Sequence, residues 1–139
     1  MVCERKPWTL CHGDFNYHQV ILNRKYTAVV NFDKMHYDIQ VKDLYQFLRK
    51  VLEKNNWDSS LGTMIMDTYL SVRTLSEEER RVLYAMLTFP EKFWKISNRY
   101  YNSRKSWISS VNYDKLCRFK KTEGQRQDFL NTFKYAFIF

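Results

Sequence analysis

The sequence predicts a mainly α-helical fold with a small β-hairpin platform, and three observations lead to this class. The 139 residues contain only three Gly and two Pro, so few positions interrupt a helix. Apolar residues recur with helical spacing from about residue 40 onward, whereas short β-branched and apolar runs are confined to residues 8–33. We therefore expect a single domain over residues 1–139, with a hairpin at 8–33 and a helical part at 40–139.

Three short strands are expected in the hairpin platform. Residues 8–11, Trp-Thr-Leu-Cys, are typical of a strand that enters a polar turn. Residues 20–22 form a second apolar run, and residues 26–32, with two consecutive Val, form a third. A polar turn at residues 23–25 connects the second and third runs, which predicts a hairpin.

Two helices with clear boundary signals follow the platform. Apolar residues at positions 44, 47, 48, 51 and 52 share one face of a first helix, which should end near Asn55. Asp58, followed by two Ser, offers N-cap chemistry for a second helix that extends through Leu70.

Three more helices complete the expected fold. Ser76 and Glu79 have the spacing of a capping box and open a third helix. Pro90 suits the first turn of a fourth, over residues 91–102. A fifth helix should run from about Tyr113 toward the end, and Gly124 either breaks or bends it. The apolar tail at residues 129–139 should pack on the domain or on a partner.

Composition excludes several classes of function. The net charge of +8 is spread over the chain, without zinc-finger spacing or an RNA-binding aromatic signature. We interpret it as solvated helix faces, so nucleic acid is not the expected partner, and a basic helical nucleic-acid binder is a distant alternative. The three Cys are widely spaced, which favours reduced thiols over a disulfide or zinc site. No apolar run approaches the roughly 20 residues of a membrane span, and no export signal is evident, so we expect cytoplasmic synthesis and no membrane partner.

The segment His12-Gly13-Asp14 carries the chemistry of the chain. It lies in a polar turn between apolar runs, and a further run ends in Asn31 and Asp33. Phosphoryl transfer needs a carboxylate to orient the attacking hydroxyl and oxygen ligands to hold Mg²⁺ against the phosphates. In this turn Gly13 permits a tight backbone path, His12 can brace the loop, and Asp14 can face a nucleophile.

These residues resemble the catalytic and metal-binding loops of the choline kinase and aminoglycoside phosphotransferase group of kinase-like enzymes. The similarity is closer to the spore coat protein S (CotS-like) branch, and it extends from about residue 8 to about residue 120. It is carried by His-Gly-Asp-Phe-Asn-Tyr-His at 12–18, Asn-Phe-Asp at 31–33, the Asp-Leu-Tyr-Gln-Phe-Leu segment that opens 43–58, Pro-Glu-Lys-Phe-Trp-Lys at 90–95 and Tyr-Tyr-Asn-Ser at 100–103.

The resemblance implies roles for three residues near the turn. Asp14 would be the catalytic base, His12 would support the loop, and Asp43 would brace the loop from the start of the first helix. Asp43 as an ordinary helix N-cap is an equally complete explanation, and both roles can hold together.

The same resemblance exposes two departures at the Mg²⁺ positions. Gln19 stands where the group has a metal-binding Asn, and Asn31 stands where it has a metal-binding Asp. Asp33 lies two residues farther along the expected strand, so it should share a face with Asn31 and could take over as a ligand. Losing a carboxylate should weaken Mg²⁺ binding considerably, which indicates a degenerate site.

Only seven residues precede Trp8, too few for the smaller lobe that covers ATP in such kinases. We therefore expect the C-terminal lobe of a protein-kinase-like fold, binding neither ATP nor Mg²⁺ alone. The implied function is a structural role in the spore coat, with other coat proteins or a missing N-terminal lobe as partners. The alternative is an active small-molecule phosphotransferase, with ATP and Mg²⁺ bound, once such a lobe is joined.

Several other residues have simpler explanations than a functional one. His18 and His36 are expected to be surface or loop residues, because no matched Cys or His spacing accompanies them. Cys11 should be a small buried apolar residue, not a nucleophile. An aromatic stripe at helical spacing is expected in the core rather than in a ligand site: Phe93, Trp94, Tyr100 and Tyr101.

Overall fold

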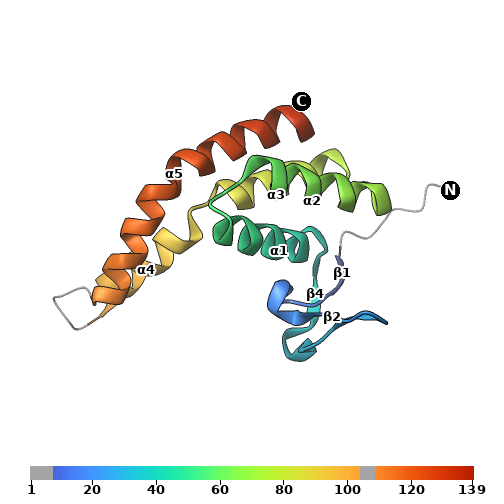
Figure 1. Ribbon diagram of the computed structural model, residues 1–139, viewed down its shortest axis with the longest axis horizontal. Helices are drawn as coiled ribbons and strands as arrows, with labels where there is room; N and C mark the ends of the chain where they lie inside the picture. The colour runs from blue at the N-terminus through green and yellow to red at the C-terminus, as the bar shows by residue number, and fades with distance from the viewer. Residues whose placement is uncertain (1–7, 104–108) are drawn as a thin grey trace.

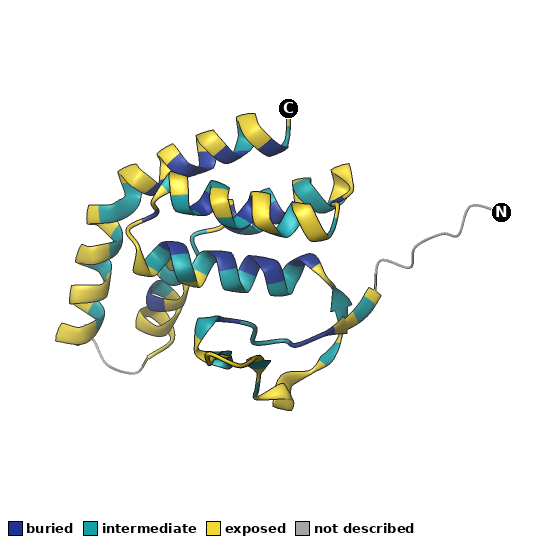
Figure 2. Ribbon diagram, turned by 45° about the vertical axis from the view of Figure 1, so that its right-hand side comes forward, coloured by how far each residue is buried: buried dark blue, intermediate teal, exposed yellow. Residues whose placement is uncertain are grey.

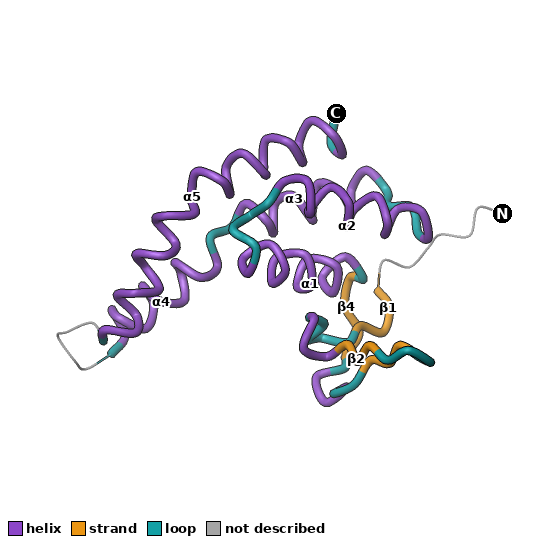
Figure 3. The backbone as a smooth tube through the Cα atoms, in the orientation of Figure 1, coloured by secondary structure: helices purple, strands orange, loops and turns teal. Residues whose placement is uncertain are grey.

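The computed structural model describes residues 8–103 and 109–139. It is mostly helical, with two small antiparallel sheets beside the first helix (Figures 1 and 3). The expected mainly α-helical class with a small β platform is therefore confirmed. Within the described residues, no helix is long and apolar enough to cross a membrane.

Four short strands form two separate pairs. β1 (Trp8–Cys11) pairs with β4 (His36–Ile39), and β2 (Val20–Leu22) pairs with β3 (Thr27–Val29). The strands at 8–11 and 20–22 and the hairpin were predicted from sequence, whereas β4 was not. The third strand is shorter than predicted, because Asn31 adopts a left-handed conformation with φ 63° and a 3₁₀ turn, Phe32–Lys34, follows.

The helices follow their capping signals closely. They are α1 (Val41–Lys54), α2 (Ser59–Val72), α3 (Glu77–Thr88), α4 (Glu91–Asn102) and α5 (Ser110–Phe137). The Asp58 carboxylate accepts the amides of Ser60 and Leu61, and Ser76 with Glu79 forms a complete capping box. These predictions are confirmed, except that Pro90 occupies the N-cap position of α4 and not its first turn.

The core lies among α1, α2, α3 and the C-terminal half of α5, whose inward faces are buried in Figure 2. The apolar tail packs on the domain through Phe129, Phe133 and Phe137, which confirms the first of the two predicted alternatives. Arg126 of α5 is also buried: it donates to the carbonyls of Leu87 (3.0 Å) and Thr88 (2.5 Å) and so satisfies the last turn of α3.

Helix α5 is longer than predicted and continues through Gly124. It begins at Ser110, because the Ser109 side chain accepts the Asn112 amide as an N-cap. The helix changes direction along its length in Figure 1, and its N-terminal half extends with α4 away from α1–α3. Gly124 therefore does not break the helix.

The aromatic stripe of α4 is not core, contrary to the prediction. Ile96 is the buried residue of this helix, whereas the aromatic side chains remain about half exposed or more: Phe93, Trp94, Tyr100 and Tyr101. The reason is that α4 packs mainly against α5, in the part of the fold that extends from the body. Helical spacing shows that these residues share a face, but not what covers that face.

Two glycines in helix interiors should respond in opposite ways to the same substitution. A Cβ at Gly62 would fall 2.3 Å from the Phe129 ring and 3.2 Å from Leu52, whereas a Cβ at Gly124 meets nothing within 4 Å. We expect Gly62→Ala to lower the free energy of unfolding by about 1–3 kcal/mol through overpacking. We expect Gly124→Ala to raise it by about 0.5–1 kcal/mol through helix propensity. Urea denaturation of both variants measures this, and stabilisation by Gly62→Ala would contradict the packing.

Candidate active site

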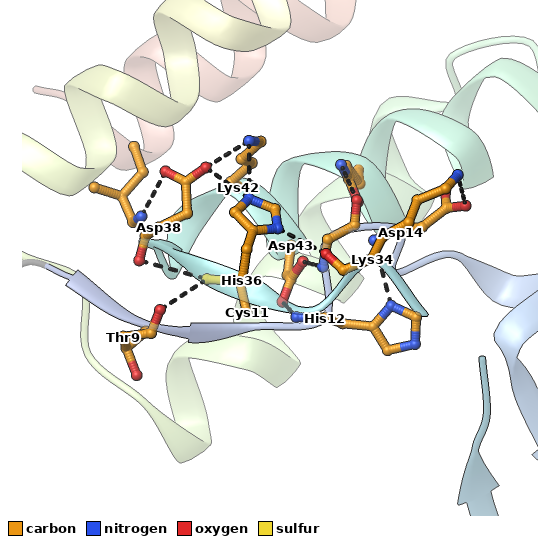
Figure 4. A network of polar contacts seen from close by, with 12 residues as sticks. Thr9, Cys11, His12, Asp14, Lys34, His36, Asp38, Lys42 and Asp43 are labelled. Carbon is orange, nitrogen blue, oxygen red and sulfur yellow. Dashed lines mark hydrogen bonds and ion pairs between the residues drawn. The ribbon is translucent and has the colours of Figure 1, made fainter. Parts of the chain in front are cut away.

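The His-Gly-Asp turn, residues 12–14, is held by the carboxylate of Asp43. Asp43 Oδ2 accepts the His12 amide at 2.7 Å, and Oδ1 accepts the Gly13 amide at 3.0 Å (Figure 4). Asp43 is the third residue of α1, and Gln40 occupies the N-cap position without a side-chain cap bond. The N-cap explanation of Asp43 is therefore wrong, because its carboxylate faces the turn instead of the helix amides.

Gly13 is required by both conformation and space. Its φ is +81°, and an added Cβ would fall 2.1 Å from the Lys34 carbonyl oxygen and 2.9 Å from His36 Nδ1. The Gly13 carbonyl also accepts a hydrogen bond from Gln46 Nε2 at 3.1 Å. The turn thus lies directly against the 34–36 segment on one side and α1 on the other.

His12 supports the turn through both ring nitrogens. Its Nδ1 accepts the Asp14 amide at 3.3 Å, which leaves the proton on Nε2 to be donated to the Val30 carbonyl at 2.8 Å. The ring is buried and lies 4.8 Å from the Phe32 ring, between centroids. His12 therefore links the turn to the chain just beyond β3.

Asp14 is partly exposed and forms an ion pair with Lys34. Its Oδ2 lies 2.8 Å from Lys34 Nζ, and Asn16 Nδ2 lies 3.3 Å from Oδ1. The hydrogen bond from Lys34 is the main cause of a lowered pKa of Asp14, which partial burial opposes. Asp14 is therefore an ionised carboxylate with a cation already on one oxygen. Sequence reasoning missed Lys34, because a strand was expected where the chain turns.

The two amides at the expected metal positions bind each other. Asn31 Nδ2 donates to Gln19 Oε1 at 2.5 Å. Asp33 belongs to the 3₁₀ turn and not to the strand, so the period-2 argument that placed it on the same face as Asn31 is wrong. In the described part of the chain, no hydrogen bond or ion pair involves the Asp33 carboxylate.

This set of donors does not fit a Mg²⁺ site. Mg²⁺ prefers hard, usually anionic oxygen ligands in octahedral geometry. Here two neutral amides satisfy each other, and the carboxylate of the turn, Asp14, faces an ammonium group. Across residues 8–103 and 109–139, no group of three or more His, Cys, Asp or Glu could hold a metal ion.

A polar cluster that sequence reasoning missed forms the other side of the turn. His36 Nδ1 donates to the Lys34 carbonyl at 2.7 Å, and its Nε2 lies 3.1 Å from Asp38 Oδ2, which also binds Lys42 (Figure 4). The hydrogen bonds to the Lys34 carbonyl and to Asp38 raise the pKa of His36, and the hydrogen bond from Lys42 lowers the pKa of Asp38 to about 2. The cluster fixes the segment that packs on Gly13.

Cys11 lies beneath this cluster as a buried thiol. Burial, followed by the charges of Asp43 and Asp38, raises the pKa of its thiol. Its Sγ donates weakly toward the Asp38 carbonyl at 3.5 Å. A thiol kept protonated in this way is not an activated nucleophile, which agrees with the sequence-based prediction.

An apolar cavity of about 690 Å³ opens beside the turn. His12 and Asp43 form a polar edge, and Gln40 and Thr68 are further polar lining residues. Most of the other lining side chains are apolar and come from β1, β3, the 3₁₀ turn, α1 and α2. Several lining residues are about half exposed, including Leu10, Phe32 and Met64. Exposed apolar surface of this kind marks a place where another group packs.

Comparison with known proteins decides the family. The family model described as "Spore coat putative kinase YutH" matches residues 3–133, nearly the whole chain. The chain belongs to the YutH family of spore coat proteins. Its kinase-like fold, expected from the His-Gly-Asp turn, is shared with this family.

Two similar proteins bear out the relationship. Spore coat protein S of Bacillus subtilis (strain 168) is 30% identical over 120 residues, which are 80% of this chain and 34% of that protein. The crystal structure of an aminoglycoside phosphotransferase from Alicyclobacillus acidocaldarius superposes with a TM-score of 0.81 at 24% identity, covering 92% of this chain and 37% of that one. The second comparison shows the fold alone. This YutH-family chain spans about a third of the length of these relatives.

Removing the charge of Asp43 should loosen the turn in this YutH-family chain. We expect Asp43→Asn to lower the free energy of unfolding by about 1–3 kcal/mol, because one backbone amide then faces an amide nitrogen instead of an acceptor. Hydrogen exchange at His12 and Gly13 should accelerate with it. Asp67→Asn, an exposed position on α2, is the matched control. Equal protection of His12 and Gly13 in both variants would contradict the bracing role.

Proposed function

We propose that this chain serves as a structural component of the spore coat, built on the C-terminal lobe of a kinase-like fold whose phosphotransfer site has lost its metal. The observation that carries the proposal is the pair of amides at the metal positions. Gln19 and Asn31 satisfy each other, and Lys34 neutralises Asp14. On this proposal the chain alone binds neither Mg²⁺ nor ATP. The names of the family and of spore coat protein S support a location in the coat.

The apolar cavity supplies the contact surface on this proposal. Its lining combines exposed apolar side chains with a fixed polar edge at His12 and Asp43, which suits an apolar protein segment better than a solvated face. The relatives have about two thirds of their length beyond the part that this chain matches. The occupant is accordingly another coat protein or a segment equivalent to the part of the relatives that this chain does not match.

One observation favours an active phosphotransferase as a second candidate. The turn retains the bracing by Asp43 and His12, and Asp14 remains ionised at its tip. In such an enzyme Asp14 would orient an attacking hydroxyl after releasing Lys34, while a joined lobe would hold ATP with Mg²⁺. The two candidates differ in whether Asp14 matters for the role of the protein.

A fluorescent fusion produced in sporulating Bacillus subtilis tests the structural role. We expect the fusion to co-purify with the coat fraction of mature spores. Met64→Glu should reduce that association by at least about tenfold, because a carboxylate would be buried in the apolar cavity. Val72→Glu is the matched control, since Val72 is an exposed apolar residue of the same helix outside the cavity.

Asp14→Asn separates the two candidates in the same assay. A structural role leaves coat association of this variant unchanged, because the substitution preserves shape and removes only the charge. Loss of association in Asp14→Asn, or a fusion that stays in the soluble fraction, would contradict the structural role.

A further inference from the structure

A second cavity, of about 280 Å³, is lined by positive charge. It lies between the C-terminal half of α1, helix α4 and the first turns of α5, all within the described residues. We call it the basic cavity. Six cationic side chains line it: Arg49, Lys50, Lys92, Lys95, Arg99 and Lys115.

Two of these six cations already have carboxylate partners. Arg49 forms ion pairs with Glu53 at 2.9 Å and with Glu91 at 3.1 Å, and Lys95 pairs with Glu91. Tyr45 donates to the same Glu91 carboxylate at 2.8 Å. This inner network links α1 to α4 and forms a rigid wall of the basic cavity.

The other four cations have no carboxylate partner in the part of the chain that the structure describes. Among the described residues, no carboxylate lies within ion-pair distance of Lys50, Lys92, Arg99 or Lys115. Four like charges around one hollow repel each other, and a concave surface concentrates their field. An anion in the hollow would relieve this repulsion and gain several charge-assisted hydrogen bonds.

One residue that lines the basic cavity also acts electrostatically on the His-Gly-Asp turn. Lys50, on its rim, is one of the charges that lower the pKa of Asp14. Lys50 lies on α1 between Gln46, which holds the Gly13 carbonyl, and Glu53, which lines the basic cavity. A ligand there would be held by residues that the turn does not use.

We propose that the basic cavity binds a small multivalent anion with at least two phosphate or carboxylate groups. Its volume is at the lower end for small-molecule sites, which favours a compact ligand over nucleic acid or a folded partner. The unpaired Lys92, Arg99 and Lys115 are the proposed contacts. This proposal does not depend on a coat role or on phosphotransfer.

Isothermal titration calorimetry of the whole chain tests the basic cavity with two probes, pyrophosphate and citrate, at about 50 mM salt. We expect saturable one-site binding of at least one probe, and the preferred probe tells phosphate from carboxylate chemistry. Lys92→Gln/Lys115→Gln should weaken that binding by about tenfold or more. Lys120→Gln/Lys121→Gln removes the same charge from exposed positions of α5 outside the cavity and should change it by less than about twofold.

The outcomes decide the proposal in both directions. Equal weakening in both double variants would show diffuse surface attraction and overturn it, as would the absence of saturable binding for both probes. Binding of a poly-glutamate peptide without binding of either small anion would also overturn it, in favour of an acidic protein partner. Circular dichroism of both variants confirms that the helices are retained, since Gln is a good helix former.

Discussion

The site depends on one carboxylate that accepts two consecutive backbone amides. Asp43 is carried by α1, whose apolar face is locked into the core through Leu44 and Leu48. The turn is therefore tied directly to the helical body, in addition to its connection with β1. The 34–36 segment can approach the turn closely because Gly13 has no side chain, and an added Cβ would collide with it.

Bracing and metal binding draw on different residues, so a protein can lose one and keep the other. Asp43 and His12 satisfy backbone groups, and their removal would leave partly buried amide donors and the Val30 carbonyl acceptor unpaired. The side chains at the expected metal positions, Gln19 and Asn31, instead form a hydrogen bond with each other. A kinase-like turn can thus persist for stability after metal binding is lost, as the structural role proposed above requires.

The sequence predicted what local signals determine. Helix starts at Ser59 and Glu77 follow from side-chain caps within three residues, and periodicity identified α1. Prediction from the sequence failed where the conformation depends on contacts between distant residues or on the backbone conformation of a single residue. The left-handed Asn31 ended the expected strand early and displaced Asp33, and β4 forms only because β1, 25 or more residues earlier, lies beside it. The ion pair between Lys34 and Asp14 was not predicted, because it depends on the unexpected turn that contains Lys34.

The most direct test of the proposed loss of the metal site is a Mn²⁺ titration followed by amide NMR, with Mn²⁺ as a paramagnetic probe for Mg²⁺. We expect no saturable line broadening at Asp14, Gln19 and Asn31 in the native chain. The double variant Gln19→Asn/Asn31→Asp, which restores the ligand types of kinase-like enzymes, should gain it. Saturable broadening centred on Gln19 and Asn31 in the native chain would show that these positions still bind a divalent cation.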